Sequence, residues 1–293
     1  MLFLKIIASV IAVLIGIATI AVLAFRHALS QLKRPPLLGP AADANTSYDG
    51  VFKDGNGELT YRLLYPTSQE RPTALFVMLH GAGLSGPTQD WLSDGSLQAL
   101  ATQENILVLL PSAGGKQNNW LDWEHPHHPD VQKMTDQAPI LFALIDKVTT
   151  DHTIDRNNVA IGGYSNGGTM AMRLACEAPS PFCAVCTFGS PTTRYQIDKG
   201  CNYPTSIMIV HGTEDSANPF DGGYPSLFGL TFPQKDLEPA LSSPDTVNFW
   251  RHANQCNAQP ETKPLKTAKK DGTSTRISTY ASTANNAPVV HVV

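Results

Sequence analysis

Short runs of apolar residues alternate along the chain with segments in which apolar residues recur at helical spacing. Runs that are apolar at nearly every position predict strands buried on both faces of a sheet. They cover residues 73–81, 106–113, 157–165, 182–190, 205–212 and 288–293. Helical spacing covers residues 131–152, 166–178 and 243–255. This alternation predicts an α/β fold with a mostly parallel central sheet and helices on both faces.

Two further segments have the pattern of more polar strands. Residues 57–66 alternate between polar and apolar side chains, and residues 261–282 form two polar runs around a Lys-Asp-Gly turn. In parallel sheets the chemistry lies at the carboxyl ends of the strands. The residues that directly follow each apolar run are therefore the candidates for a functional site.

The N-terminus predicts a segment outside this fold. Residues 6–25 carry no charge, and a helix of that length can cross a bilayer. Small residues at 22–24 also resemble a signal-peptide cleavage site, so residues 1–25 are read as a signal peptide or a membrane anchor, with the anchor favoured. Residues 26–47, with paired prolines and no sustained period, are read as a linker, and residues 48–293 as the catalytic domain.

Composition and charge exclude several classes of function. The 293 residues carry a net charge of −4, which provides no basic field for nucleic acid. The five cysteines lack metal-type spacing, and they allow one or two disulfides in an exported protein without revealing the pairing. His125, His127 and His128 lie in a proline-broken loop that offers no rigid set of ligands. We therefore predict no metal and no cofactor.

The clearest chemical signal is the motif Gly163-Tyr164-Ser165-Asn166-Gly167, which lies between a predicted strand and a predicted helix. A serine on such a sharp turn needs small neighbours on both sides, and the turn lifts its Oγ clear of the sheet. The helix that follows supplies backbone N–H groups and a positive dipole end. This G-x-S-x-G pattern predicts a nucleophilic serine at position 165.

A serine nucleophile needs an oxyanion hole, a base and an acid that orients the base. The backbone N–H groups of Asn166 and of Ala82, in the glycine-rich loop after an early strand, are the candidates for the hole. His80 precedes that loop and is expected to have a structural role. Asp215 follows a later strand, in the chain order expected of the acid, and is preferred to Glu214.

These motifs resemble the α/β-hydrolase esterases of the polyhydroxybutyrate depolymerase and feruloyl esterase family. The resemblance covers about residues 50–293 and rests on the segments LHGAG at 79–83, NNWLDWE at 118–124, 161–190 and 209–222. It implies an α/β-hydrolase fold, serine-dependent ester hydrolysis and export, with Ser165 as nucleophile, Asp215 as acid and Ala82 and Asn166 as the oxyanion hole. The charges flanking residues 6–25, read alone, would instead keep the domain in the cytoplasm.

This chain departs from the family pattern at two positions. The family often has cysteine where Ala82 stands, although the backbone N–H is retained. It also often has a cysteine partner for Cys256 near residues 280–286, where this chain has none. A disulfide at Cys256 is therefore not expected.

The position of the catalytic histidine is a separate question. His252 lies in a helical segment, and His291 lies between valines in the middle of the last predicted strand. In the family, such a strand is followed by a Gly-Gly-His type segment that carries the base. We therefore expect the chain to be truncated at the last strand and the base to lie beyond Val293, with His291 as the alternative.

The predicted function is hydrolysis of carboxylic esters, such as polyhydroxyalkanoate or feruloyl-polysaccharide esters, through an acyl-enzyme. Trp120 and Trp123 are candidates for the wall of a substrate pocket, although they also fit positions in the core or at the rim. A non-catalytic binding protein and a serine peptidase on the same fold are the alternatives. The expected partners are an ester substrate, no nucleic acid, and a membrane if residues 6–25 are retained; the expected location is extracellular or the cell envelope.

Overall fold

A computed structural model describes the domain that the sequence predicts. The described residues are 46–68, 70–115, 118–121, 136–177, 182–224, 226–227, 230–231, 239–265 and 272–293. The proposed signal or anchor at 1–25, and nearly all of the linker, lie outside these ranges. None of the helices within them has the length and apolar character needed to cross a membrane.

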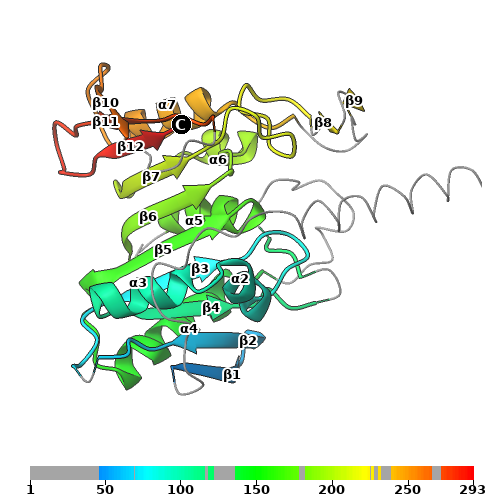
Figure 1. Ribbon diagram of the computed structural model, residues 1–293, viewed down its shortest axis with the longest axis vertical. Helices are drawn as coiled ribbons and strands as arrows, with labels where there is room; N and C mark the ends of the chain where they lie inside the picture. The colour runs from blue at the N-terminus through cyan, green and yellow to red at the C-terminus, as the bar shows by residue number, and fades with distance from the viewer. Residues whose placement is uncertain are drawn as a thin grey trace, which may run out of the picture. The chain divides into compact units, whose positions relative to one another are not determined.

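The described residues form one large sheet, with the strand order β1-β2-β4-β3-β5-β6-β7-β12-β11-β10 (Figure 1). Its centre is parallel and consists of the apolar runs that the sequence predicts. These central strands are β3 (Leu75–Leu79), β4 (Leu107–Pro111), β5 (Val159–Tyr164), β6 (Phe182–Phe188), β7 (Ser206–Val210) and β12 (Val289–Val292). The predicted mostly parallel sheet is confirmed.

Antiparallel strands flank the parallel centre on both sides. β1 (Ser47–Asp54) and β2 (Gly57–Leu64) lie at one side, while β10 (Glu261–Leu265) and β11 (Thr275–Tyr280) lie at the other. β12 pairs with β7 on one side and with β11 on the other, so the last strand lies inside the sheet. The separate hairpin of β8 (Ser226–Leu227) and β9 (Leu230–Thr231) is short.

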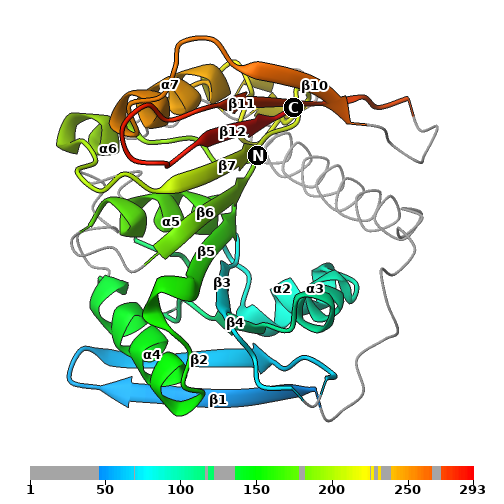
Figure 2. The ribbon, with the colours of Figure 1, turned by 90° about the vertical axis from the view of Figure 1, so that its left-hand side faces the viewer.

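Helices cover both faces of the sheet, as Figure 2 shows. One face carries α4 (Ala138–Asp151), α5 (Asn166–Cys176), α6 (Arg194–Lys199) and α7 (Ser243–Ala253), and the other carries α2 (Gly86–Leu92) and α3 (Ser96–Glu104). The main core cluster joins the first group to the sheet through buried side chains such as Leu144 and Trp250. The helix predicted over 131–152 begins at Ala138, so Pro139 lies in its first turn, where proline is tolerated.

A disulfide joins the end of α5 to the segment after α6. Cys176 and Cys201 are bonded, whereas Cys183, Cys186 and Cys256 are free. Cys186 is partly buried, and burial raises the pKa of its thiol to about 11, which keeps it protonated and unreactive. Of the one or two disulfides that the sequence allows, the structure has one, and Cys256 is not part of it.

Loss of this disulfide is expected to destabilise the domain. Cys176 and Cys201 are 25 residues apart, and opening a loop of that size costs about 3–4 kcal/mol in the chain-entropy model. Urea unfolding of the Cys176→Ala/Cys201→Ala variant should show a loss of that order, while Cys256→Ser, which removes a free thiol, should change stability little. An equal loss in both variants would contradict the assignment.

Candidate active site

Ser165 lies in a strained turn between β5 and α5. Its backbone angles are φ 52° and ψ −125°, which a non-glycine residue adopts at a cost of about 1–3 kcal/mol. The end of β6 holds this turn in place: Ser165 N–H donates to the Phe188 carbonyl at 2.9 Å, and Ser190 Oγ donates to the Ser165 carbonyl at 2.9 Å. Strain sustained by surrounding contacts at a strand–helix junction is the geometry expected of a nucleophile elbow.

The glycines on either side of Ser165 are required by space. A Cβ on Gly163 would lie 2.3 Å from backbone atoms of Gly167, and a Cβ on Gly167 would lie 2.4 Å from the His80 carbonyl oxygen. The first turn of α5 therefore packs directly on the end of β3. This close approach places the nucleophile beside the loop that the sequence predicts to form the oxyanion hole.

His80, at the end of β3, has a structural role, as predicted. The side chain is fully buried, its Nδ1 donates to the Gly81 carbonyl at 2.7 Å, and its Nε2 accepts from Ala113 N–H at 3.0 Å. Burial lowers the pKa of His80, which favours the neutral ring that these bonds require. Both ring nitrogens are thus used to fix the start of the oxyanion loop.

The two predicted oxyanion donors lie in the loop after β3 and at the start of α5. Ala82 is exposed, and its N–H has no hydrogen-bond partner within the described ranges. Its neighbour Gly81 packs against the ring of Tyr164, since a Cβ there would lie 3.0 Å from that ring. Asn166 is the first residue of α5, where backbone N–H groups point out of the helix end. Asn166 thus directly follows Ser165, and the loop that contains Ala82 packs against Tyr164, the residue before it.

Trp120 links the oxyanion loop to the nucleophile helix. Its indole Nε1 donates to the His80 carbonyl at 3.0 Å. Its backbone N–H and carbonyl bond the side-chain amide of Asn166 at 2.8 and 3.1 Å. With only 2% of its surface exposed, Trp120 belongs to the core. Its sequence allowed either a position in the core or rim or a place in the wall of a substrate pocket, and its burial favours the core. Trp123, the other candidate for a pocket wall, lies outside the described residues.

A buried arginine that the sequence analysis missed supports the same region. Arg173 lies on α5 with 3% of its side chain exposed, and it pairs with Asp136 at 2.7 Å and Glu177 at 2.8 Å. It also donates to the Leu121 carbonyl. Burial alone would raise the pKa of Asp136, but its hydrogen bond and charge interaction with Arg173 lower it overall. Arg173 thus ties Leu121 and Asp136 to α5.

Asp215 lies in the loop after β7, as predicted for the acid. Its Oδ1 accepts the backbone N–H groups of Ala217 and Asn218, both at 2.9 Å, which fixes the carboxylate in a side-chain turn. A Cβ on Gly189 would lie 2.9 Å from Asp215 Oδ2, so the carboxylate packs over the end of β6. Glu214 is exposed. The structure therefore brings Asp215 to the strand end that also holds the turn of Ser165.

The two histidines that follow Asp215 in the sequence have other contacts. His291 Nε2 bonds Ser243 Oγ at 2.9 Å, and its ring stacks on Phe220 with centroids 6.0 Å apart. It is a strand residue whose side chain lies on one sheet face, as its valine neighbours predict. His252 is exposed on α7, where its Nδ1 bonds the Asn248 carbonyl at 2.7 Å.

Ser165 Oγ has a different partner. Within the part of the chain that the structure describes, its hydrogen bond is with Asn218 Nδ2, at 3.4 Å, and none of its partners is a histidine. The alternative role for His291, as base, thus gains no support from its contacts. The expectation of a base beyond Val293 concerns residues outside this sequence and stays a prediction.

The buried His291 predicts an acid-sensitive step in stability. Burial, with smaller contributions from His211 and Arg276, lowers the pKa of His291 to about 4, below the ordinary value of 6.5. Between those values the unfolded chain binds a proton that the folded chain does not, so stability should fall as pH falls from about 6.5 to about 4.

The corresponding measurement is urea unfolding at pH 7.5 and pH 5. We expect His291→Gln, which keeps a hydrogen-bonding side chain beside Ser243 and does not titrate, to lose less stability over this interval than the unsubstituted protein. The exposed His252→Gln serves as the matched control and should lose as much as the unsubstituted protein. Identical losses in all three proteins would show that His291 is not the titrating group.

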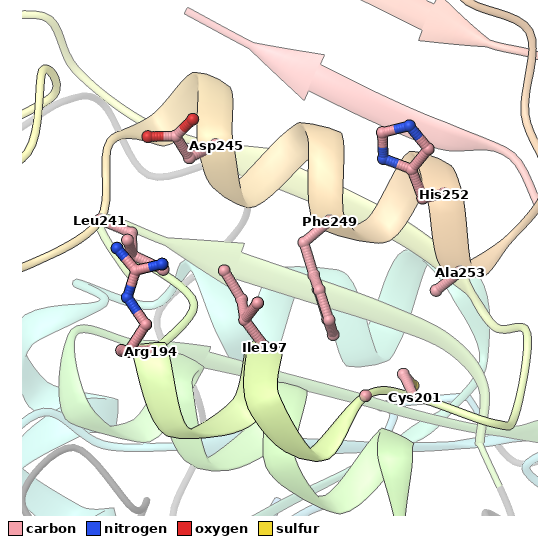
Figure 3. A pocket seen from close by; sticks show the side chains of 9 residues that line it. Arg194, Ile197, Cys201, Leu241, Asp245, Phe249, His252 and Ala253 are labelled. Carbon is pink, nitrogen blue, oxygen red and sulfur yellow. The ribbon is translucent and has the colours of Figure 1, made fainter.

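A cavity of about 490 Å³ lies away from Ser165, between α6 and α7 (Figure 3), and Ile197 and Phe249 project into the space between these helices. The other residues around it are Arg194, Gly200, Cys201, Leu241, Asp245, His252 and Ala253. Within the described ranges no cluster of His, Cys, Asp or Glu fits a metal ion, and His125, His127 and His128 lie outside them.

Comparison with known proteins identifies the family. The model of the phospholipase/carboxylesterase family matches residues 66–226, which include Ala82, Ser165, Asn166 and Asp215. The chain belongs to this family. It is accordingly a carboxylic ester hydrolase of the serine hydrolase type, and the function class predicted from the sequence is confirmed.

Several curated relatives of this esterase are themselves named as esterases. The putative esterase NocK of Nocardia uniformis subsp. tsuyamanensis is 28% identical over 86% of this chain and 73% of its own length. Probable feruloyl esterase C of Aspergillus niger is 32% identical over 61% of this chain and 62% of its own. The poly(3-hydroxybutyrate) depolymerase of Ralstonia pickettii is 28% identical over 54% of this chain, but the match spans only 35% of that protein.

A solved structure supports the fold assignment. The acetyl xylan esterase from Aspergillus awamori superposes with a TM-score of 0.54 and 13% sequence identity, covering 83% of this chain and 92% of that one. At this identity the likeness bears on the fold alone. Together with the family match, it confirms the predicted α/β-hydrolase fold.

Proposed function

We propose that Ser165 is the nucleophile of this esterase, with Ala82 and Asn166 N–H as the oxyanion hole and Asp215 as the acid. The observation that carries this proposal is the strained backbone of Ser165, at φ 52°, held between β5 and α5. Ser165 Oγ attacks the ester carbonyl carbon while its proton passes to the general base. The two N–H groups stabilise the oxyanion, the alcohol leaves, and water then releases the acid from the acyl-enzyme.

The proposed substrates are esters of hydroxyalkanoic or hydroxycinnamic acids, including polymeric ones. The names of several relatives support this choice, because one is named a poly(3-hydroxybutyrate) depolymerase and others are named probable feruloyl esterases. The matches span 35% of the first and 62% of the Aspergillus niger protein, so the likeness concerns part of each relative rather than its whole length. The two acid classes differ in shape: one is a flexible aliphatic chain and the other a flat aromatic ring.

A side-by-side substrate panel tests the function and the substrate class together. We expect hydrolysis of p-nitrophenyl butyrate. We also expect kcat/KM for either 3-hydroxybutyrate oligomers or methyl ferulate to be higher than kcat/KM for p-nitrophenyl butyrate. A fluorophosphonate probe should add one label, located on Ser165 by peptide mass spectrometry. Hydrolysis without labelling at Ser165 would contradict the assignment of the nucleophile, whereas labelling with no preference for either acid would contradict the substrate class only.

We also propose that the catalytic domain acts outside the cytoplasm, either secreted or anchored by residues 6–25. Support comes from the uncharged length of that segment and from the Cys176–Cys201 disulfide, a bond that is uncommon in reducing compartments. Cell fractionation with protease protection tests this proposal. Sequencing of the mature N-terminus distinguishes a cleaved signal from an anchor. A catalytic domain that is protected from protease inside the cytoplasm would overturn the proposed location.

A further inference from the structure

Asn218 connects the nucleophile turn to the acid loop. Its side-chain Nδ2 donates to the Gly189 carbonyl at 2.7 Å and to Ser165 Oγ at 3.4 Å. Its backbone N–H donates to Asp215 Oδ1 at 2.9 Å, and its backbone carbonyl accepts from His211 Nε2 at 2.8 Å. One residue therefore bonds groups at the ends of β5, β6 and β7 and the predicted acid.

These contacts fix the direction of the Asn218 amide. A primary amide has two N–H donors in one plane. The short bond to the Gly189 carbonyl uses one of them, and the second is directed at Ser165 Oγ. The backbone on either side is held by Asp215 and by His211, whose side chain is 1% exposed. Three bonds besides the one to Ser165 thus position the donor.

We infer that Asn218 is a catalytic hydrogen-bond donor to the nucleophile, a role that rests on the proposed function of Ser165. At 3.4 Å the bond to the neutral hydroxyl is long. When the Oγ–H bond breaks and the proton passes to the base, Oγ gains negative charge, and a bond from the amide to that charge becomes stronger. Asn218 therefore stabilises the attacking oxygen more in the transition state than in the resting enzyme.

This role predicts a loss of kcat rather than of substrate binding. Asn218→Ala in the full-length protein should lower kcat for p-nitrophenyl butyrate by about 100-fold, the lower end of the effect of removing one donor to a developing oxyanion. KM should change little, because the lost bond acts on the nucleophile and not on the substrate. The rate of fluorophosphonate labelling of Ser165 should fall in parallel.

The isosteric variant Asn218→Asp separates donation from shape. Its carboxylate fits the same space but cannot donate while ionised, so at pH 8 its loss should be at least that of Asn218→Ala. As pH is lowered from 8 to 5, a growing fraction of the new carboxyl group, whose ordinary pKa is about 3.9, is protonated and can donate again. The ratio of its kcat/KM to that of the unsubstituted enzyme should therefore rise, while the same ratio for Asn218→Ala should stay constant.

Asn254→Asp is the matched control. Asn254 is a fully buried asparagine whose side chain also makes two bonds, to the backbone of Thr205 at the opposite end of β7. This variant should be less stable than the unsubstituted enzyme. The amount of folded enzyme is measured by fluorophosphonate labelling of Ser165, and kcat per labelled enzyme should equal that of the unsubstituted enzyme at all pH values.

The outcomes distinguish this inference from the proposed function. If the unsubstituted enzyme neither hydrolyses esters nor labels at Ser165, the proposed function itself fails. If it does both, but folded Asn218→Ala keeps kcat within twofold, the inference alone is overturned. Failure of both Asn218 variants to fold would assign Asn218 a purely structural role and would equally overturn it.

Discussion

Replacement of Ser165 by alanine is expected to lower kcat for p-nitrophenyl butyrate by about 10⁶-fold in the full-length enzyme. The substitution removes the oxygen that is proposed to form the acyl-enzyme, so hydrolysis through that intermediate is no longer possible. The proposed oxyanion donors, the backbone N–H groups of Ala82 and Asn166, stay in place. A residual rate above that in buffer is therefore expected, because binding and oxyanion stabilisation still act on direct attack by water.

Fold integrity can be checked independently of that rate. Ser165 holds its strained conformation through backbone bonds to the end of β6, which alanine can also make. We therefore expect the urea unfolding midpoint to be nearly unchanged and the fluorophosphonate label to be absent. A variant that is folded, unlabelled and still as active as the unsubstituted enzyme would show that another residue is the nucleophile.

The second large effect is expected for Asp215→Asn, with a loss in kcat of about 10⁴-fold. The carboxylate packs over Gly189 beside the nucleophile turn, where it can orient a histidine base and stabilise the charge that this base gains. An asparagine at this position fits the space but carries no charge. KM should change little, because this interaction is made chiefly in the transition state.

Glu214→Gln is the matched control for this variant. It removes a carboxylate from the adjacent residue, whose side chain is exposed. Its kcat should stay within about twofold, since exposed charges contribute little at this range. If both variants lose activity equally, the loop rather than the Asp215 carboxylate is what matters, and the assignment of the acid is wrong.

Local patterns predicted much of the fold because each strand and helix carries its own signal. The apolar runs around Val77, Ile161 and Ile209 became central strands, since a strand buried on both faces must be apolar throughout. The helices α2, α3 and α6 were missed, although Ser85 caps α2 and Thr193 caps α6 with hydrogen bonds at 3.3 and 3.1 Å. They have only 7, 9 and 6 residues, too few for an apolar period to emerge.

The sequence also indicated the turn at Ser165, because the small residues that such a turn needs lie within five consecutive positions, 163–167. The space at Gly163 and Gly167 and the positive φ of Ser165 are consequences of one tight strand–helix junction. Asp215 was proposed as the acid because of chain order, which follows the order of the strands along the sequence. These features depend on neighbours in sequence or on topology, and a single sequence records both.

Only the tertiary structure decided the contacts between residues that are distant in sequence. The pairing of Cys176 with Cys201 depends on how α5 and α6 pack, and the burial of Trp120 depends on its bonds to His80 and Asn166. Asn218 carries no local signal, because its role arises where three strand ends converge. The sequence alone indicated the central strands, the longer helices, and the serine and acid that are proposed for catalysis. The packing of those elements decided which side chains surround that serine, because hydrogen bonds depend on distances that chain position does not encode.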